Sequence, residues 1–130
     1  MTNIARDIKE DYLRVRIYLP LDEMQRFGCS EDDIRQGRLN DAFISLLKSH
    51  IERCRSFYAS ARAGIQHVEG MRPRLVILAI KEIYAAILDE IEKNRYDVFS
   101  KRAYVSLSRK FVIALAIICK KGYGHENKPG

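Results

Sequence analysis

The sequence is poor in the residues on which many small folds and metal sites rely. Its 130 residues include no tryptophan, three prolines, seven glycines and three cysteines. Cys29, Cys54 and Cys119 are too few and too scattered for a disulfide framework, and no C-x-x-C pair is present to hold zinc. We therefore expect a reducing, cytoplasmic compartment, with Cys54 and Cys119 as small residues of the core.

Long apolar runs and several motifs are also missing. The longest apolar run, from Phe111 to Cys119, is well short of the roughly 20 residues that a membrane-spanning helix needs. The opening MTNIARDIKED has no apolar region typical of a signal peptide. No G-x-x-x-x-G-K, G-x-S-x-G or H-E-x-x-H occurs, which argues against P-loop proteins, serine hydrolases of that type and zincins. We expect a soluble chain.

What the sequence does contain is positive charge and enough apolar residues for a core. Lys and Arg number 23 against 17 Asp and Glu, a formal charge of +6, and hydrophobic residues make up 47%. The excess charge favours an anionic partner: a phosphorylated small molecule, an acidic membrane surface or nucleic acid. Nucleic acid is the weakest of these, because acidic residues are interspersed and no known reader motif or aromatic platform occurs.

Hydrophobic spacing predicts an all-α fold without strands. Pro20 forces an extended piece before it, Ser30 with Asp33 resembles a capping box, and Gly70 is expected to stop the longest helix. The fourth helix is apolar nearly all round, so we expect it to be buried on several sides. The predicted helices cover residues 3–15, a short segment from 30, 40–68, 73–94 and 107–120, in a domain of residues 1–120 with a disordered tail at 121–130.

Two carboxylates in the first predicted helix are candidates for metal binding. Asp7 and Asp11 are one turn apart, so their side chains share a face and repel each other unless a cation lies between them. Mg²⁺ favours one or two carboxylates together with phosphate oxygens, which Arg6 and Arg16 could also bind. The plainer alternative is a solvated face, since Arg6 and Glu10 can pair at i,i+4.

The whole string around these carboxylates is more specific than the pair. N-I-x-R-D-x-x-E-D over residues 3–11, followed by R-x-Y-L-P over 16–20, resembles the second aspartate-rich motif of the squalene/phytoene synthases. The segment Y-x-x-I-L-D-E-I at 84–91 is similar to a late helix of that family. The resemblance covers about residues 2–118 and also includes Asp22-Glu23-Met24, Phe27-Gly28, residues 30–34, Tyr96 and Lys101-Arg102.

This resemblance implies a fold and a site. The fold would be part of an isoprenoid-synthase-type helical bundle, corresponding to the C-terminal half of such an enzyme, whose first aspartate-rich motif lies upstream. Asp7 and Asp11 would be the metal ligands, and with Arg6 they would be catalytic. The substrate-binding residues implied by the family are Asn3, Arg16, Tyr18, Tyr84 and Arg102.

The implied activity is Mg²⁺-dependent head-to-head condensation of two prenyl diphosphates. Met71-Arg72-Pro73 and residues 105–108 look like those of bacterial hopanoid-pathway enzymes, which favours farnesyl diphosphate and a presqualene diphosphate or squalene product. NADPH would be needed if the product is squalene. The alternatives are a phytoene synthase using geranylgeranyl diphosphate, and a non-catalytic helical fragment acting as a partner subunit.

The resemblance also implies partners and includes one departure. A complementary N-terminal half-chain is expected, as is peripheral contact with a membrane because the products are lipophilic; no nucleic acid is expected. Val15 stands where the family usually has glycine before the R-x-Y-L-P arginine. Valine is stiff and costly at positive φ, so we expect the turn after the first helix to differ.

Overall fold

The computed structural model describes residues 1–122, and over that range it contains helices and no strand. The predicted all-α class is therefore confirmed. The helices are α1 (Thr2–Arg6), α2 (Ile8–Leu13), α3 (Leu21–Phe27), α4 (Glu31–Arg35), α5 (Asp41–Ile65), α6 (Met71–Lys93) and α7 (Leu107–Gly122).

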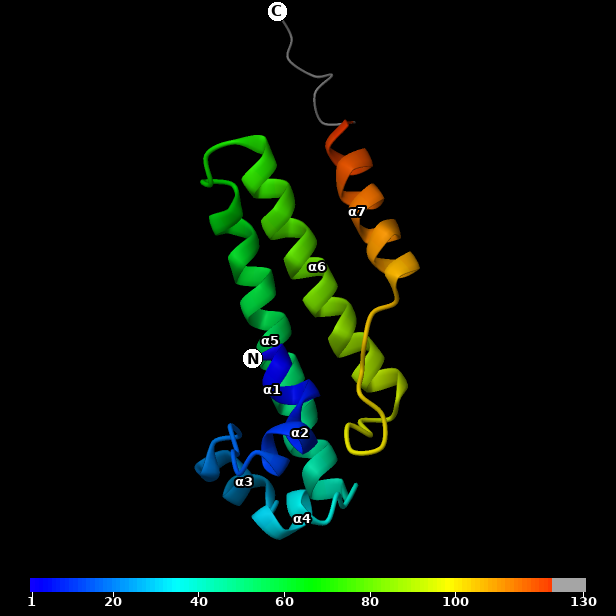
Figure 1. The fold of residues 1–130 in the computed structure, drawn as a ribbon. Coiled ribbons are helices and arrows are strands. Elements are labelled where there is room, and N and C mark those ends of the chain that lie inside the picture. The colour runs from blue at the N-terminus through cyan, green and yellow to red at the C-terminus, as the bar shows by residue number, and fades with distance from the viewer. Residues whose placement is uncertain (123–130) are drawn as a thin grey trace, which may run out of the picture.

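A long hairpin of α5 and α6 forms the frame of the molecule (Figure 1). The side chain of Asn40 caps α5 by accepting a hydrogen bond from the Phe43 amide at 2.8 Å. Helix α7 packs along α6, while α1 contacts both α5 and α6 and α3 contacts α5. The most deeply buried side chains of the core include Phe43, Met24, Leu46, Leu47, Ile51, Leu88 and Ile91.

The first predicted helix is in fact two short helices. Asp7, with φ −104° and ψ 18°, separates α1 from α2, so the prediction of one continuous helix was wrong. The i to i−4 hydrogen bonds of an α-helix nevertheless continue on both sides of the break. Asp7 N–H donates to Asn3 O and Asp11 N–H donates to Asp7 O, both at 2.8 Å. The two acidic residues therefore remain one turn apart along the chain.

Two polar contacts hold α1 on α5. The hydroxyls of Thr2 and Tyr58 are 2.5 Å apart, and His50 Nε2 lies 3.3 Å from the Met1 carbonyl oxygen. Burial lowers the pKa of His50, so the imidazole is neutral at neutral pH. The start of the chain is thus anchored where the acidic motif begins.

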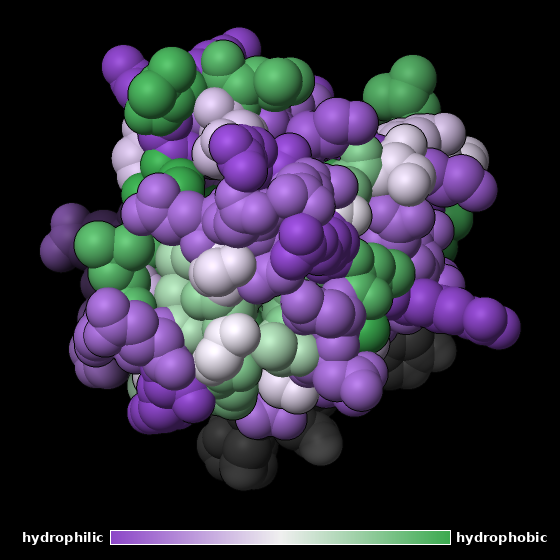
Figure 2. All heavy atoms as spheres, turned by 90° about the horizontal axis from the view of Figure 1, so that it is seen from below, coloured by the Kyte–Doolittle hydropathy of each residue, from purple (hydrophilic) through white to green (hydrophobic). Residues whose placement is uncertain are grey.

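Helices α3 and α4 cover one end of the hairpin, seen from below in Figure 2, where polar side chains are prominent and apolar ones show between them. The capping box before α4 is confirmed: Ser30 N–H donates to Asp33 Oδ2 at 2.8 Å, and Asp33 N–H donates to Ser30 Oγ at 3.2 Å. Helix α3 was not predicted. Its seven residues are too few for a clear periodic pattern, and Gly28 ends it in the left-handed conformation at φ 70°.

Several predictions about α5 and α6 need correction. Helix α5 ends at Ile65, and Gly70 precedes the first residue of α6 instead of stopping α5. Helix α6 is buried only in its second half, at Ala86, Ile87, Leu88 and Ile91. In its first half Val76 is 57% exposed and Ile80 49%. The expectation of burial on several sides fails there because α5 and α7 flank this stretch but leave the face with Val76 and Ile80 uncovered.

The cysteine and tail predictions have mixed outcomes. Cys54 is buried in the core, as predicted, but Cys119 is exposed on α7. Helix α7 continues to Gly122, so residues 121 and 122 are helical and not part of a tail. The remainder of the predicted disordered tail lies outside the described residues.

Val15 adopts φ 57°, the left-handed region that a glycine occupies without strain. Its side chain is 94% exposed, so it gains almost no packing in return. We predict that Val15→Gly raises the free energy of unfolding by up to about 1 kcal/mol, because relief of the strain exceeds the added entropy of the unfolded chain. Urea denaturation followed by helical circular dichroism measures the change.

The neighbouring Arg14 provides the control. Its φ is −92°, where glycine relieves no strain, so Arg14→Gly is expected to destabilise the protein. Equal destabilisation by both glycine substitutions would contradict the claim of strain at Val15.

Candidate functional site

Asp7 lies at the centre of a charged cluster at the α1–α2 break. Arg6 donates two hydrogen bonds to its carboxylate, from Nε to Oδ1 at 2.6 Å and from Nη2 to Oδ2 at 2.5 Å. Arg102 donates from Nε to Asp7 Oδ1 at 3.2 Å and lies 3.4 Å from Glu10 Oε1. We call Arg6, Asp7, Glu10 and Arg102 the Asp7 cluster. It joins the acidic motif to a residue 95 positions further along the chain.

Opposing influences act on the ionisation of Asp7. Partial burial on its own raises the pKa of Asp7, but the hydrogen bonds and charges of Arg6 and Arg102 outweigh burial, so the pKa falls below its usual value. The same hydrogen bond raises the pKa of Arg6. Asp7 is therefore a carboxylate at neutral pH.

The loop between α6 and α7 brings Arg102 to this cluster. Phe99 packs its ring 4.7 Å from the ring of Phe43 in the core, and Lys9 Nζ donates to the Phe99 carbonyl at 2.8 Å. Asp97 accepts hydrogen bonds from the amides of Phe99 and Ser100. This loop is thus fastened both to α5 and to α2, which fixes the approach of Arg102 to Asp7.

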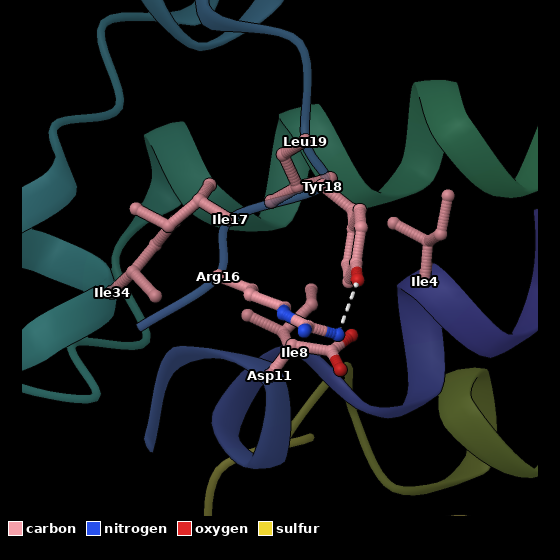
Figure 3. Close-up of a pocket in the computed structure, with 8 residues that line it drawn as sticks. All are labelled: Ile4, Ile8, Asp11, Arg16, Ile17, Tyr18, Leu19 and Ile34. Carbon is pink, nitrogen blue, oxygen red and sulfur yellow. Dashed lines mark hydrogen bonds between the residues drawn. The ribbon is translucent and has the colours of Figure 1, made fainter. Parts of the chain in front are cut away.

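Asp11 points into a different environment. It lines a small pocket with Arg16 and Tyr18, and the three side chains converge in Figure 3. Arg16 Nη1 donates to Tyr18 Oη at 3.3 Å. The pocket has a volume of about 10 Å³, room for a single water molecule and no substrate. Its apolar walls are Ile4, Ile8, Ile17, Leu19 and Ile34.

The two remaining candidates lie at the edges of this region. Tyr84 on α6 packs against the core, and α6 contacts α1, which carries Arg6. Asn3 is exposed on α1, where its backbone carbonyl accepts from the Asp7 amide. The structure therefore groups Arg6, Asp7, Arg102 and Tyr84 in one place and Asp11, Arg16 and Tyr18 in another.

The acidic pair has the chemistry that Mg²⁺ prefers but not a full set of ligands. No group of three or more His, Cys, Asp or Glu side chains in residues 1–122 is arranged to hold a metal ion. Mg²⁺ is commonly held by one or two carboxylates, with phosphate oxygens and water completing six ligands. Asp7 and Asp11 are carboxylates of that kind, partly buried on consecutive turns. Their side chains face different neighbours, since Asp7 pairs with Arg6 and Arg102 while Asp11 lines the small pocket, so both would have to turn toward a shared ion.

Larger hollows surround the Asp7 cluster. A cleft of about 250 Å³ is lined by Arg6, Lys9, Arg102 and the acidic Glu10. A second cleft of about 470 Å³ shares Arg102 and is also lined by Lys101, Arg109 and the acidic Glu90. A groove of about 590 Å³ runs between α6 and α7; we call it the α6–α7 groove. Basic side chains outnumber acidic ones in both clefts beside the Asp7 cluster.

Sequence reasoning missed a second ion-pair network. Arg109 on α7 pairs with Asp89 and Glu90 on α6. Arg55 on α5 pairs with the same Asp89 and with Glu92. These pairs tie α5, α6 and α7 together. No local sequence pattern predicts these pairs, because each joins side chains from separate helices.

The comparisons with known proteins agree with this arrangement of an acidic motif on a helical frame. The family model for squalene/phytoene synthase matches residues 1–109. The chain belongs to the squalene/phytoene synthase family. It is 44% identical over 121 residues to phytoene synthase 1, chloroplastic, from Solanum lycopersicum. The aligned region covers 93% of this chain and 29% of the relative.

Bacterial and structural relatives extend the comparison. Phytoene synthase from Arthrospira platensis is 41% identical over 114 residues, covering 86% of this chain and 36% of the relative. A crystal structure of a dehydrosqualene synthase in complex with ligand has the same fold, with a TM-score of 0.83 at 24% identity, covering 94% of this chain and 43% of that one. The chain thus spans about a third of its curated relatives' length.

The geometry predicts that Arg102 controls the ionisation of Asp7. Replacing Arg102 with alanine removes a charge that lowers the pKa of Asp7, while the opposing effect of burial remains, so that pKa is expected to rise. NMR titration of the Asp7 carboxyl measures it directly.

Lys101→Ala provides the matched control, because Lys101 is adjacent and exposed but makes no ion pair with a described residue. It is expected to leave the pKa of Asp7 nearly unchanged. Equal shifts in the two variants would show that general surface charge, rather than the Arg102–Asp7 contact, sets the ionisation.

Proposed function

We propose that this chain forms one wall of a Mg²⁺-dependent active site for head-to-head condensation of two prenyl diphosphates. The observation that carries the proposal is the Asp7 cluster: a partly buried carboxylate on an R-D-x-x-E-D motif, bracketed by two arginines that converge from distant parts of the chain. The 41–44% identity to phytoene synthases over most of the chain supports it.

The proposed roles follow from the charges of the residues. Asp7 and Asp11 would hold Mg²⁺, which when bound neutralises the diphosphate of the substrate that ionises. Arg6, Arg16 and Arg102 would bind diphosphate oxygens directly, and the hydroxyls of Tyr18 and Tyr84 would donate hydrogen bonds to them. Arg6 and Arg102 now pair with Asp7. When metal and diphosphate bind, Asp7 would pair with the metal and the two arginines with the diphosphate, so neither the carboxylate nor the arginines would lose a charged partner.

Apolar side chains on the same frame would shelter the reacting carbon chains. In the reaction proposed, one substrate loses diphosphate to give an allylic cation, and the C2–C3 double bond of the other attacks its C1. Loss of a proton then closes a cyclopropane ring. Ile80, Ile83 and Ile87 on α6 are proposed to exclude water from this cation.

Two substrates are candidates. The phytoene synthase relatives favour geranylgeranyl diphosphate, and the motifs at 71–73 and 105–108 favour farnesyl diphosphate. A reductive step with NADPH would follow only on a squalene-type route. The proposed compartment is the cytoplasm, consistent with three free cysteines in the described residues.

A second candidate function is a non-catalytic partner subunit. It is favoured by the exposed apolar stretch of α6 at Val76, Ile77 and Ile80, which no described helix covers. On this account a complementary half-chain would bury that stretch. Both functions require the same partner, and they differ in whether Asp7 and Asp11 support turnover.

The decisive experiment replaces the matching segment of the Arthrospira platensis phytoene synthase with this chain. We expect the chimaera to convert geranylgeranyl or farnesyl diphosphate only when Mg²⁺ is present. Asp7→Asn or Asp11→Asn is expected to lower turnover by orders of magnitude, because a neutral amide binds Mg²⁺ far more weakly than a carboxylate. Product analysis with each substrate also determines the preferred chain length.

Asp41→Asn is the matched control, since Asp41 is an exposed carboxylate on α5 outside the Asp7 cluster. It is expected to leave turnover close to that of the parent chimaera. Near-normal turnover of both Asp7 and Asp11 variants would refute the metal role. A folded chimaera with no product under any condition would favour the partner-subunit function.

A further inference from the structure

The loop between α6 and α7 carries Arg102 to the Asp7 cluster, and its two halves are held in different ways. The first half is fastened to α5 and to α2. In the second half, residues 101–105 make no backbone–backbone hydrogen bond with any other described residue. Ala103 and Val105 are buried there, whereas the side chain of Arg102 is 54% exposed. The course of this half therefore depends on its buried side chains and on the point at which it enters α7.

An ion pair across the base of the loop fixes that point. Arg109, in the first turn of α7, donates from Nη1 to Glu90 Oε1 and from Nη2 to Asp89 Oδ2, the second at 3.4 Å. Asp89 and Glu90 lie near the end of α6, so these contacts join the two helices on either side of residues 94–106. Figure 1 shows the loop leaving the lower end of α6 and rising again to the start of α7. Closing a loop at its base removes much of its conformational freedom.

Apolar packing does little to hold the start of α7. The α6–α7 groove of about 590 Å³ runs between the two helices, and apolar side chains of α7 line it instead of closing it. Leu107 and Phe111, at the start of α7, are 72% and 70% exposed. The side chains of Arg109 and Glu90 are only 33% and 25% exposed, which partly shields their attraction from water. Charge is therefore the main contact between the start of α7 and α6.

The carboxylate partners of Arg109 are suited to a fixed contact. Lys93 also donates to Glu90, at 2.9 Å, and together Lys93 and Arg109 hold the pKa of Glu90 below its usual value. Glu90 is thus ionised at neutral pH. Since Arg109 already pairs with two carboxylates, its guanidinium is engaged within the chain, unlike a free cation waiting for an anionic ligand.

We propose that Arg109 is a positioning residue, which closes the base of the loop by pairing with Glu90 and so holds Arg102 within reach of Asp7. Arg109 acts through Arg102 and would not touch a substrate. Its consequence for catalysis rests on the proposed function, in which Arg102 binds diphosphate. The structural claim concerns only the contacts within this chain, so it can be tested without any substrate.

Hydrogen exchange at the arginine Nε–H groups tests the claim, measured by nitrogen-15 NMR on the full chain. Arg6 and Arg102 both donate from Nε to Asp7 Oδ1, at 2.6 and 3.2 Å, and a hydrogen-bonded N–H exchanges more slowly than a free one. In Arg109→Ala and in Glu90→Ala we expect exchange at Arg102 to become about threefold faster, the scale of a partly exposed ion pair. Exchange at Arg6 is expected to change little, because Arg6 is adjacent to Asp7 and does not depend on the loop.

Arg55→Ala is the matched control. Arg55 also pairs with Asp89, and with Glu92, but it joins α5 to α6 and does not span the loop. We expect it to leave exchange at Arg102 unchanged. Equal acceleration at Arg102 in Arg55→Ala and Arg109→Ala would overturn the proposal, because loss of any ion pair on α6 would then suffice.

Three other outcomes would also overturn it. They are unchanged exchange at Arg102 in both loop-base variants, equal acceleration at Arg6 and Arg102, and fast exchange at Arg102 already in the parent chain. Circular dichroism of each variant confirms that the helices are retained. The measurement uses neither substrate nor Mg²⁺, so its failure is distinguishable from failure of the proposed condensation activity in the chimaera.

Discussion

The candidate site depends on the paired charges of Asp7. This residue interrupts the first helical segment, and its carboxylate accepts hydrogen bonds from Arg6 beside it and from Arg102, which lies on the loop between α6 and α7. A partly buried carboxylate without such partners would favour its neutral form. The contacts of Phe99 with Phe43 and Lys9 hold that loop in place, so the aromatic core and the charged cluster support each other.

Helices α6 and α7 each expose apolar side chains. In the first half of α6, Val76, Ile77 and Ile80 form an exposed apolar face. Helix α7 likewise exposes Leu107, Phe111, Leu115 and Ile118. Over the described residues, no helix is both long and apolar enough to cross a membrane.

Much of the fold could be predicted from the sequence. The 3–4 spacing of apolar residues identified α5, α6 and α7, and the Ser30–Asp33 pair identified the start of α4. Periodicity could not reveal the break at Asp7, because the hydrogen bonds on either side of it keep helical spacing. Nor could it show which apolar faces remain exposed, since burial depends on the neighbours that tertiary structure provides.

The site was predicted unevenly. The motif identified Arg6, Asp7 and Arg102, and the structure brings these three together. Asp11 was expected beside Asp7, yet it lines the small pocket with Arg16 and Tyr18. The roles of Lys9 and Arg109 were invisible in the sequence, because a contact with a backbone carbonyl or with a carboxylate on another helix leaves no local pattern.

The most direct test of the central claim is calorimetric titration of Mg²⁺ into this chain in the presence of inorganic diphosphate. The account predicts saturable Mg²⁺ binding that requires diphosphate and that is lost in Asp7→Asn and in Asp11→Asn. Binding of equal strength in the parent chain and in both variants would contradict it, because the metal and diphosphate would then be held elsewhere.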